Sequence, residues 1–244
     1  MQFGLSEEQT LLLDNVNRFL DDNSPLDRVR AYADGGDDAD IWAGLAELGV
    51  PALLIPEAQG GIGLKPLDAA IVAQSLGAHI TPSPFLGTAV MAPTALTASG
   101  GQYDDLLAEI AAGTHRVGIA FSEAIKRRND AQVEARDGAL FGKSLFAFDA
   151  DADSYLVADQ KQHLYLVAAD DPGLTRTHLT TVDKTRRTVE LTYDNAAAQS
   201  VSTDVRVFES VLDIGRVAIA ADTMGAAQNM LDQAVEYAKQ REQF

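Results

Sequence analysis

The feature of this sequence that most limits its fold is the stretch from Ser210 to Phe244, which contains no proline. Apolar residues recur in it every three or four positions, the period of one face of an α-helix. A single helix over this range is about 50 Å long at 1.5 Å per residue, far longer than the usual helix of about 11 or 12 residues. We therefore predict an element of a helical bundle, with these positions on its buried face: Val217, Ala221, Met224, Ala227, Leu231, Ala234 and Ala238.

The last octet of this stretch, Tyr237 to Phe244, has no Gly, Asn or Pro stop signal. The pattern predicts that the helix runs to the final residue. We expect the sequence to end inside a helix.

Composition places the chain among globular proteins, with 46% hydrophobic and 23% charged residues in 244. The formal charge of −17 argues against nucleic acid and anionic membrane surfaces as primary partners, because both require a cationic surface. The absence of cysteine excludes disulfides, a thiolate nucleophile and iron–sulfur clusters. The sequence shows neither a signal peptide nor a membrane-spanning run, so we expect a cytoplasmic protein.

Residues 1–115 show a helical pattern. A capping box formed by Ser6 and Gln9 starts the first helix. The loop from Pro56 to Gly63 is too rich in glycine for regular structure, and Pro66 suits the first turn of the next helix. Further helices are predicted over the ranges 26–32, 41–48, 66–76, 85–99 and 103–112.

From about Arg116 the pattern changes to short apolar or alternating runs, which favours β-strands up to about residue 207. Asp137 and Gly138 predict a hairpin turn between two strands. The runs 117–121, 144–148, 154–157, 163–167, 188–192 and 201–207 predict further strands. The fold class is therefore α+β and multidomain: an N-terminal helical bundle (1–115), a central antiparallel β-barrel or sandwich (116–207) and the start of a C-terminal helical bundle (208–244).

Several local patterns have the residue types of a binding site, but a structural role explains each of them better. Asp149, Asp151 and Asp153 have the first spacings of a calcium loop but lack its glycine and glutamate, so we predict a solvated turn. The four scattered histidines do not have zinc spacing. The two basic clusters, 126–128 and 184–187, could meet phosphate groups, but we favour solvated loops.

Four stretches, taken together and in order, resemble the acyl-CoA dehydrogenase family. The N-terminal part is similar in Leu5 to Gln9, in the run from Leu45 to Leu64 and in Ser75 to Gly77 with Pro82 to Ala89. The middle part is similar in Asp137 to Lys143 with Ala152 and Asp153, and the last part in Met224 to Gln228 and Tyr237 to Phe244. The resemblance covers essentially the whole chain.

This resemblance implies a FAD-dependent enzyme that removes an α-proton and a β-hydride from an acyl-CoA thioester and yields the 2-enoyl-CoA. It also implies an electron-transfer flavoprotein as electron acceptor, and homo- or hetero-oligomers. The residues that carry the resemblance do not indicate which acyl chain the enzyme binds.

The resemblance also assigns residues to the cofactor. Phe121 and Ser122, followed by Glu123, match the start of the family's flavin-binding loop, but Ala124 and the segment 126–129 depart from it. Phe146 and Phe148 fall where the family places Trp and Thr or Ser against the flavin, so Phe146 keeps a stacking ring and Phe148 loses the hydroxyl. Three residues match the segment that reaches the FAD of a neighbouring subunit: Arg241, Gln243 and Phe244.

The sequence contains no position that matches the family's catalytic glutamate, and neither Glu236 nor Glu242 is assigned to that role. Two explanations stay open. The sequence is part of a longer dehydrogenase, which we favour because the last helix lacks a stop signal, or it is a non-catalytic scaffold subunit of a heteromer.

Overall fold

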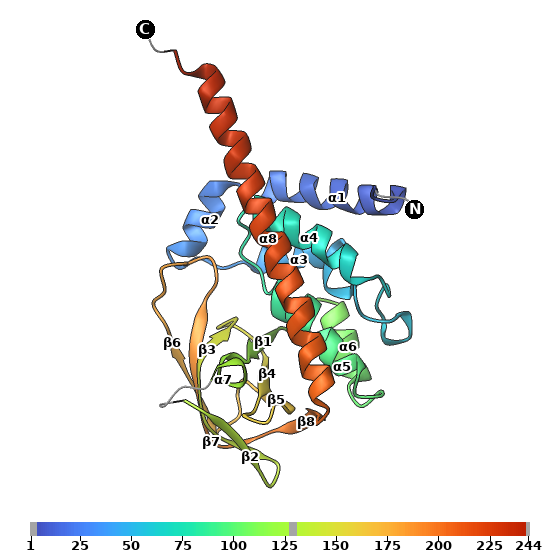
Figure 1. Cartoon of the computed structure of the whole chain (residues 1–244), viewed down its shortest axis with the longest axis vertical. Helices are drawn as coiled ribbons and strands as arrows, with labels where there is room; N and C mark the ends of the chain where they lie inside the picture. Colours follow the sequence, from blue (N-terminus) through green and yellow to red (C-terminus); the bar gives the residue numbers. More distant parts are fainter. Residues whose placement is uncertain (1–3, 127–130, 243–244) are drawn as a thin grey trace.

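The computed structural model describes residues 4–126 and 131–242 (Figure 1). A group of helices precedes a strongly curved sheet, and one long helix then runs back along the helical group. The described elements before the sheet are α1 (Glu7–Asn23), α2 (Leu26–Ala33), α3 (Ala39–Glu47), η1 (Val50–Ala52), η2 (Glu57–Gln59), α4 (Pro66–Ala78), η3 (Phe85–Met91), α5 (Ala92–Thr97) and α6 (Asp104–Ala111).

The capping box predicted at the start of α1 is confirmed. The backbone N–H of Gln9 donates to the hydroxyl of Ser6 at 3.1 Å, and Gln9 accepts from the backbone N–H of Ser6 at 3.0 Å. The helix predicted over 85–99 is instead a π-helical η3 followed by α5. Pro93 cannot donate a backbone hydrogen bond, and Ala92 donates to Gly87, five residues back, so the wider turn lies just before the proline.

The sheet has the strand order β6-β7-β3-β1-β4-β5-β8, with β2 paired to β3. All of these pairs are antiparallel except β1 with β4. The predicted α+β class with a mostly antiparallel β region is therefore confirmed. The bounds are β1 (Val117–Ala120), β2 (Val133–Arg136), β3 (Ala139–Phe148), β4 (Ser154–Ala158), β5 (Leu164–Ala168), β6 (Leu174–His178), β7 (Thr188–Ala197) and β8 (Gln199–Ser202), with a short helix α7 (Ser122–Ile125) after β1.

The hairpin predicted at Asp137 and Gly138 is confirmed, since Arg136 pairs with Ala139 and both turn residues have positive φ. Strand β6 was not predicted, because its sequence LTRTH is exposed after Leu174 and offers no apolar run. The strand predicted over 201–207 is wrong beyond Ser202. Asp204 instead caps a helix there, accepting from the backbone N–H of Arg206 at 3.0 Å.

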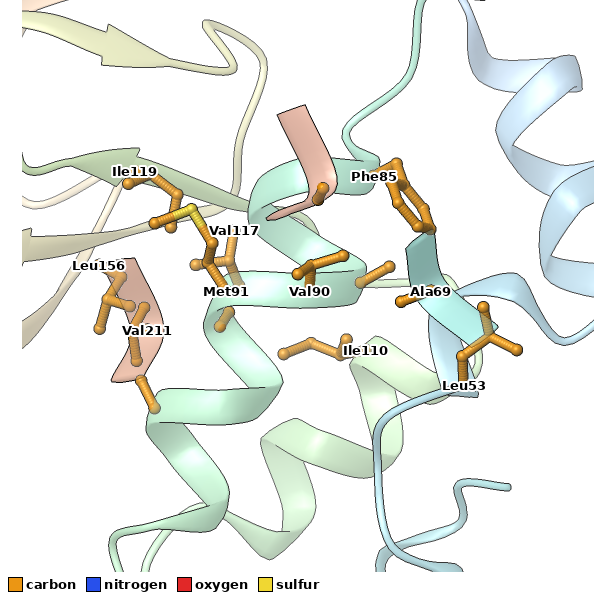
Figure 2. Packing of buried hydrophobic residues seen from close by; sticks show 14 of the residues in the cluster. Leu53, Ala69, Phe85, Val90, Met91, Ile110, Val117, Ile119, Leu156 and Val211 are labelled. Carbon is orange, nitrogen blue, oxygen red and sulfur yellow. The ribbon is translucent and has the colours of Figure 1, made fainter. Parts of the chain in front are cut away.

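Strands β1 and β4 are buried on both faces, because they lie between two apolar cores. Val117, Ile119 and Leu156 face a core that they share with the helices (Figure 2), whereas Tyr155 and Val157 face the interior of the curved sheet. The helical part and the sheet are thus joined by one continuous apolar interface.

The long C-terminal helix α8 (Val205–Gln240) is confirmed as a single element, with two corrections at its ends. It begins five residues before the predicted Ser210. It ends at Gln240, and Arg241 has an extended backbone (φ −77°, ψ 110°). The last carbonyl groups of a helix lack N–H partners within it, so its final turn is the least supported.

The face of α8 that is buried differs from the predicted stripe. Val217, Met224 and Leu231 are at least half exposed, and Ala221 alone of the predicted stripe is half-buried. Helix α8 crosses α4 so closely that a Cβ atom on Gly225 would lie 1.9 Å from the carbonyl oxygen of Gln74. Close contact between backbones selects small residues rather than large apolar ones. The buried positions of α8 are Phe208, Val211, Gly215, Ala218 and Gly225.

Within the described ranges, no helix is both long and apolar enough to cross a membrane.

Candidate functional site

Two phenylalanines form an aromatic face on the outer side of β3. Phe146 is 43% exposed and Phe148 is 38% exposed, whereas Ala147 between them is fully buried. Successive side chains of a strand point to opposite sides, so the two rings share one side of β3. We call these two residues the β3 aromatic face. A planar ring system can stack on such a surface.

The turn after β1 lies beside this face, because β1 and β3 are paired with Ile119 opposite Phe148. Glu123 is buried and holds the turn in place. Its Oε1 accepts from the backbone N–H of Leu145 at 3.0 Å, and its Oε2 accepts from the hydroxyl of Ser122 at 2.7 Å. Glu123 therefore fixes α7 against the residue that precedes Phe146.

Phe121 and Ser122 occupy different environments in this turn. The ring of Phe121 is 3% exposed and packs on Phe208 of α8, with 5.3 Å between ring centroids. It belongs to the core, so only its backbone can face a ligand. The hydroxyl of Ser122 is half-buried and already donates to Glu123.

A cleft adjoins the aromatic face where the sheet, α4, η3 and α8 meet. Phe148 lines both the face and the cleft, so the two are continuous. The cleft volume is about 70 Å³, on a scale on which one water molecule needs about 10–15 Å³. It therefore admits a small group. Its apolar walls include Leu76, Phe85, Leu86, Ala218 and Ile219.

An ion pair connects two walls of the cleft. Arg186, in the loop between β6 and β7, donates to Asp222 of α8 at 2.6 Å. Burial raises the pKa of Asp222, and the positive charge of Arg186 opposes that rise. The pair ties the sheet to α8 at the cleft.

The cleft wall also contains Asp149, the residue after β3. Its Oδ1 accepts from the backbone N–H of Asp151 at 3.3 Å, whereas its Oδ2 is buried without a hydrogen-bond partner. Burial raises the pKa of Asp149 to about 6; Arg116 lowers it and Asp38 raises it further. Asp149 is therefore an acceptor that the protein leaves half satisfied.

The cations near Asp149 are bound to other groups. Arg116 donates to Asp38 at 2.9 Å. Arg187 donates to Asp151 at 3.1 Å, lies over the ring of Tyr32 at 4.2 Å and also donates to the backbone oxygen of Gly36. These contacts join α2 and α3 to the sheet.

The basic cluster 184–187 is thus only partly the solvated loop that we predicted, because two of its arginines are in ion pairs. The calcium-like tract is a structural turn: Asp151 pairs with Arg187, and Asp153 accepts from the backbone N–H of Arg116 at 2.8 Å. Among residues 4–126 and 131–242, no cluster of three or more acidic or histidine side chains is arranged to hold a metal ion. The cluster 126–128 lies largely outside the described residues.

Glu109, His115 and Ser154 are arranged in the order of a hydrolase triad. His115 lies 2.9 Å from the hydroxyl of Ser154 and 3.5 Å from the carboxylate of Glu109. Ser154 is only 4% exposed, so its hydroxyl is closed to a substrate. The arrangement ties the end of α6 to β4.

Arg241 lies far from the aromatic face of its own chain. It follows the last turn of α8 and sits over the ring of Tyr237 at 5.6 Å. From Asp222, which lines the cleft, to Arg241 the helix rises about 29 Å. Figure 1 shows this end of α8 extending past the helical group, away from the sheet. The other two residues of this group, Gln243 and Phe244, lie outside the described residues.

The resemblance predicts flavin contacts at Phe146 and Phe148, which the structure places on one side of β3, whereas no sequence pattern indicates Asp149, Asp222 or Tyr32 as parts of a cleft. Asp222 lies on a helix whose buried side was predicted incorrectly, and Tyr32 reaches the cleft from a helix far away in sequence. In the sequence, the adjacent arginines Arg186 and Arg187 predict acidic partners but do not show which residues these are.

Comparisons with known proteins identify the family of the chain. Residues 6–114 match the family model "Acyl-CoA dehydrogenase, N-terminal domain", and residues 205–244 match "Acyl-CoA dehydrogenase, C-terminal domain". The acyl-CoA dehydrogenase IpdE2 of Mycobacterium tuberculosis is 33% identical over 98% of this chain and 66% of its own length. IpdE2 of Mycolicibacterium smegmatis is 30% identical, with coverages of 98% and 67%. The chain thus spans about two thirds of the length of these relatives.

Solved structures share the fold. A Tcur3481-Tcur3483 steroid ACAD variant has a TM-score of 0.87 and 26% identity, covering 98% of this chain and 68% of that one. A glutaryl-CoA dehydrogenase from Mycobacterium smegmatis, in complex with FADH2, has a TM-score of 0.84 and 18% identity, with coverages of 98% and 67%. The second likeness concerns the fold alone.

Proposed function

Because the chain belongs to the acyl-CoA dehydrogenase family, a family of flavoprotein oxidoreductases, we propose that it acts in a FAD-dependent acyl-CoA dehydrogenase. The proposed reaction removes a proton from Cα and a hydride from Cβ of an acyl-CoA thioester and leaves a Cα=Cβ double bond. FAD, when bound, supplies the hydride acceptor, and an electron-transfer flavoprotein takes the electrons onward. The observation that supports this function best is the β3 aromatic face beside a cleft.

The residues of this face fit the flat ring of a flavin. Phe146 and Phe148 offer two rings on one side of a strand, and the backbone behind them is fixed by Glu123 through Leu145. Phe148 has no hydroxyl, so any hydrogen bond to the flavin at this position has to come from the backbone or from the turn at Ser122. The protein's part is to orient the ring and exclude water from it.

The general base is assigned to no described residue. Glu236 is exposed and pairs with Lys239 at 2.5 Å, and Glu242 is exposed at the end of α8. We propose that the base comes either from sequence beyond Phe244 or from a partner chain.

A second candidate function is a non-catalytic scaffold subunit of a heteromeric dehydrogenase. The similar steroid ACAD named above carries two component names, which favours an assembly of unlike chains. The loss of a hydroxyl at Phe148 and the narrow cleft agree with a subunit whose own site has changed. In that case the chain supports a partner's site.

The test is to express the continuous open reading frame, purify the resulting oligomer and record its flavin spectrum. A library of acyl-CoA thioesters is then assayed with an artificial electron acceptor. Bound FAD with turnover is the expected result. Absence of both FAD and turnover would contradict the leading proposal, and co-purification with an unlike, FAD-bearing chain would favour the scaffold.

A variant pair tests the aromatic face itself. Phe146→Ala should lower flavin affinity by about fivefold or more, because one stacked ring contributes about 1 kcal/mol or more. Phe141→Ala removes the same ring from the same strand about 17 Å away, where it lies under Arg136, and should retain flavin. Equal loss in both variants would point to a general weakening of β3 instead.

A further inference from the structure

The carboxyl group of Asp149 has one oxygen without a protein partner. Oδ1 accepts from the backbone of Asp151, but Oδ2 is buried and receives no hydrogen bond. A buried polar atom of this kind is rare in folded proteins and calls for a physical explanation, of which a ligand is one. Since Asp149 forms part of the cleft wall, a ligand in the cleft can approach it.

The charged groups around Asp149 leave its Oδ2 available to accept a hydrogen bond from a ligand. Arg116 is paired with Asp38, and Arg187 is paired with Asp151, so neither cation is committed to Asp149. Burial raises the pKa of Asp149 to about 6, so the group is a carboxylate above that pH. A carboxylate accepts hydrogen bonds and donates none.

The composition of the cleft limits which donor fits. Its apolar walls favour a hydrocarbon body. Arg186 and Arg187, which line the cleft beside the ion-paired Asp38 and Asp222, disfavour a cationic ligand, whereas Asp149 repels an anionic one. A neutral hydroxyl group on an apolar body satisfies all three conditions.

We propose that this cleft binds the acyl part of a hydroxylated acyl-CoA thioester, with the acyl hydroxyl donating a hydrogen bond to Oδ2 of Asp149. The inference rests on the proposed function and adds the chemical class of the acyl group. The acyl group is placed in this cleft because Phe148 joins the cleft to the aromatic face, where the proposed reaction takes place.

Binding of matched thioesters to the full-length oligomer tests this proposal without turnover. Saturated acyl-CoA thioesters of increasing length, each with and without a terminal hydroxyl, are titrated by calorimetry. At one chain length the hydroxylated member should bind about tenfold more tightly, the effect of a hydrogen bond to a charged group. Asp149→Asn should reduce that preference to about threefold or less, because the bond then involves a neutral acceptor.

Asp213→Asn is the matched control, since it removes an exposed carboxylate of α8 that pairs with Arg216 and does not line the cleft, and it should keep the preference. Unchanged binding of the unsubstituted thioester to Asp149→Asn shows that this variant is folded. Equal affinity for both members at every length, or an unchanged preference in Asp149→Asn, would overturn the inference and leave the proposed function standing. No binding of any thioester would contradict both.

Discussion

At the scale of single residues, Asp149 makes the stability of the folded protein depend on pH, which the sequence alone does not predict. An ordinary aspartate titrates near pH 3.9, whereas burial raises the pKa of Asp149 to about 6 in the folded protein. Between these values the folded state binds more protons than the unfolded state. The contribution of Asp149 to stability therefore falls as pH rises from about 4 to about 6.

Asp149→Asn removes this titration while keeping a residue that tolerates the positive φ of 65° at this position. Relative to the parent protein, the variant should gain up to about 3 kcal/mol in its free energy of unfolding between pH 4 and pH 7. Urea denaturation at a series of pH values measures the difference. A difference that stays constant across this range would show that the carboxyl group titrates normally.

The sequence predicted some of these residue roles and could not predict others. The pair Phe146 and Phe148 could be placed from the resemblance, because both lie within one strand. The cleft around Asp149 could not, since it joins Tyr32, Asp149 and Asp222 from three regions of the chain. Neither periodicity nor spacing carries information on contacts between such distant segments.

At the scale of the elements, the crossing of α4 and α8 shows why the length of α8 was predictable and its buried face was not. A repeat of apolar residues predicts that a helix forms, but the face that is buried depends on how near the partner helix comes. Here the two backbones touch at Gly77 and Gly225, each of which would place a Cβ 1.9 Å from a carbonyl oxygen of the other helix. Large side chains such as Met224 are therefore turned outward.

The close crossing of α4 and α8 predicts the sign of the change in free energy of unfolding that Gly225→Ala causes. Alanine is favoured over glycine by about 1 kcal/mol inside a helix, so Gly225→Ala on an isolated α8 would be stabilising. In the folded protein the added methyl meets the backbone of α4, and we expect a net loss of about 1–3 kcal/mol or more. Gly4→Ala, where nothing lies within 4 Å, is the control for chemical denaturation. A stabilised Gly225→Ala would mean that the two helices are farther apart.

At the scale of the whole molecule, α8 separates the two groups of proposed flavin contacts, since one lies beside its middle and the other follows its last turn. Phe148 lies at the level of Asp222, and Arg241 lies about 29 Å farther along the helix. A single chain therefore does not bring an aromatic face and an Arg241 together, whereas two neighbouring chains of an oligomer can. We expect Arg241 to act on the cofactor held by a neighbouring chain, where a guanidinium suits a pyrophosphate.

Complementation between differently tagged copies of the full-length protein tests this arrangement. Phe146→Ala and Arg241→Ala oligomers, each purified alone, should both lose most of their flavin. In a mixed dimer, one site combines the face of the Phe146→Ala chain with the altered position 241 of its neighbour, so it carries both changes. The other site combines the intact face of the Arg241→Ala chain with the intact Arg241 of the Phe146→Ala chain, so it carries neither. The mixed dimer should therefore regain about half of the parent flavin content. If Arg241 acted within its own chain, both sites of the mixed dimer would stay defective and no flavin would return.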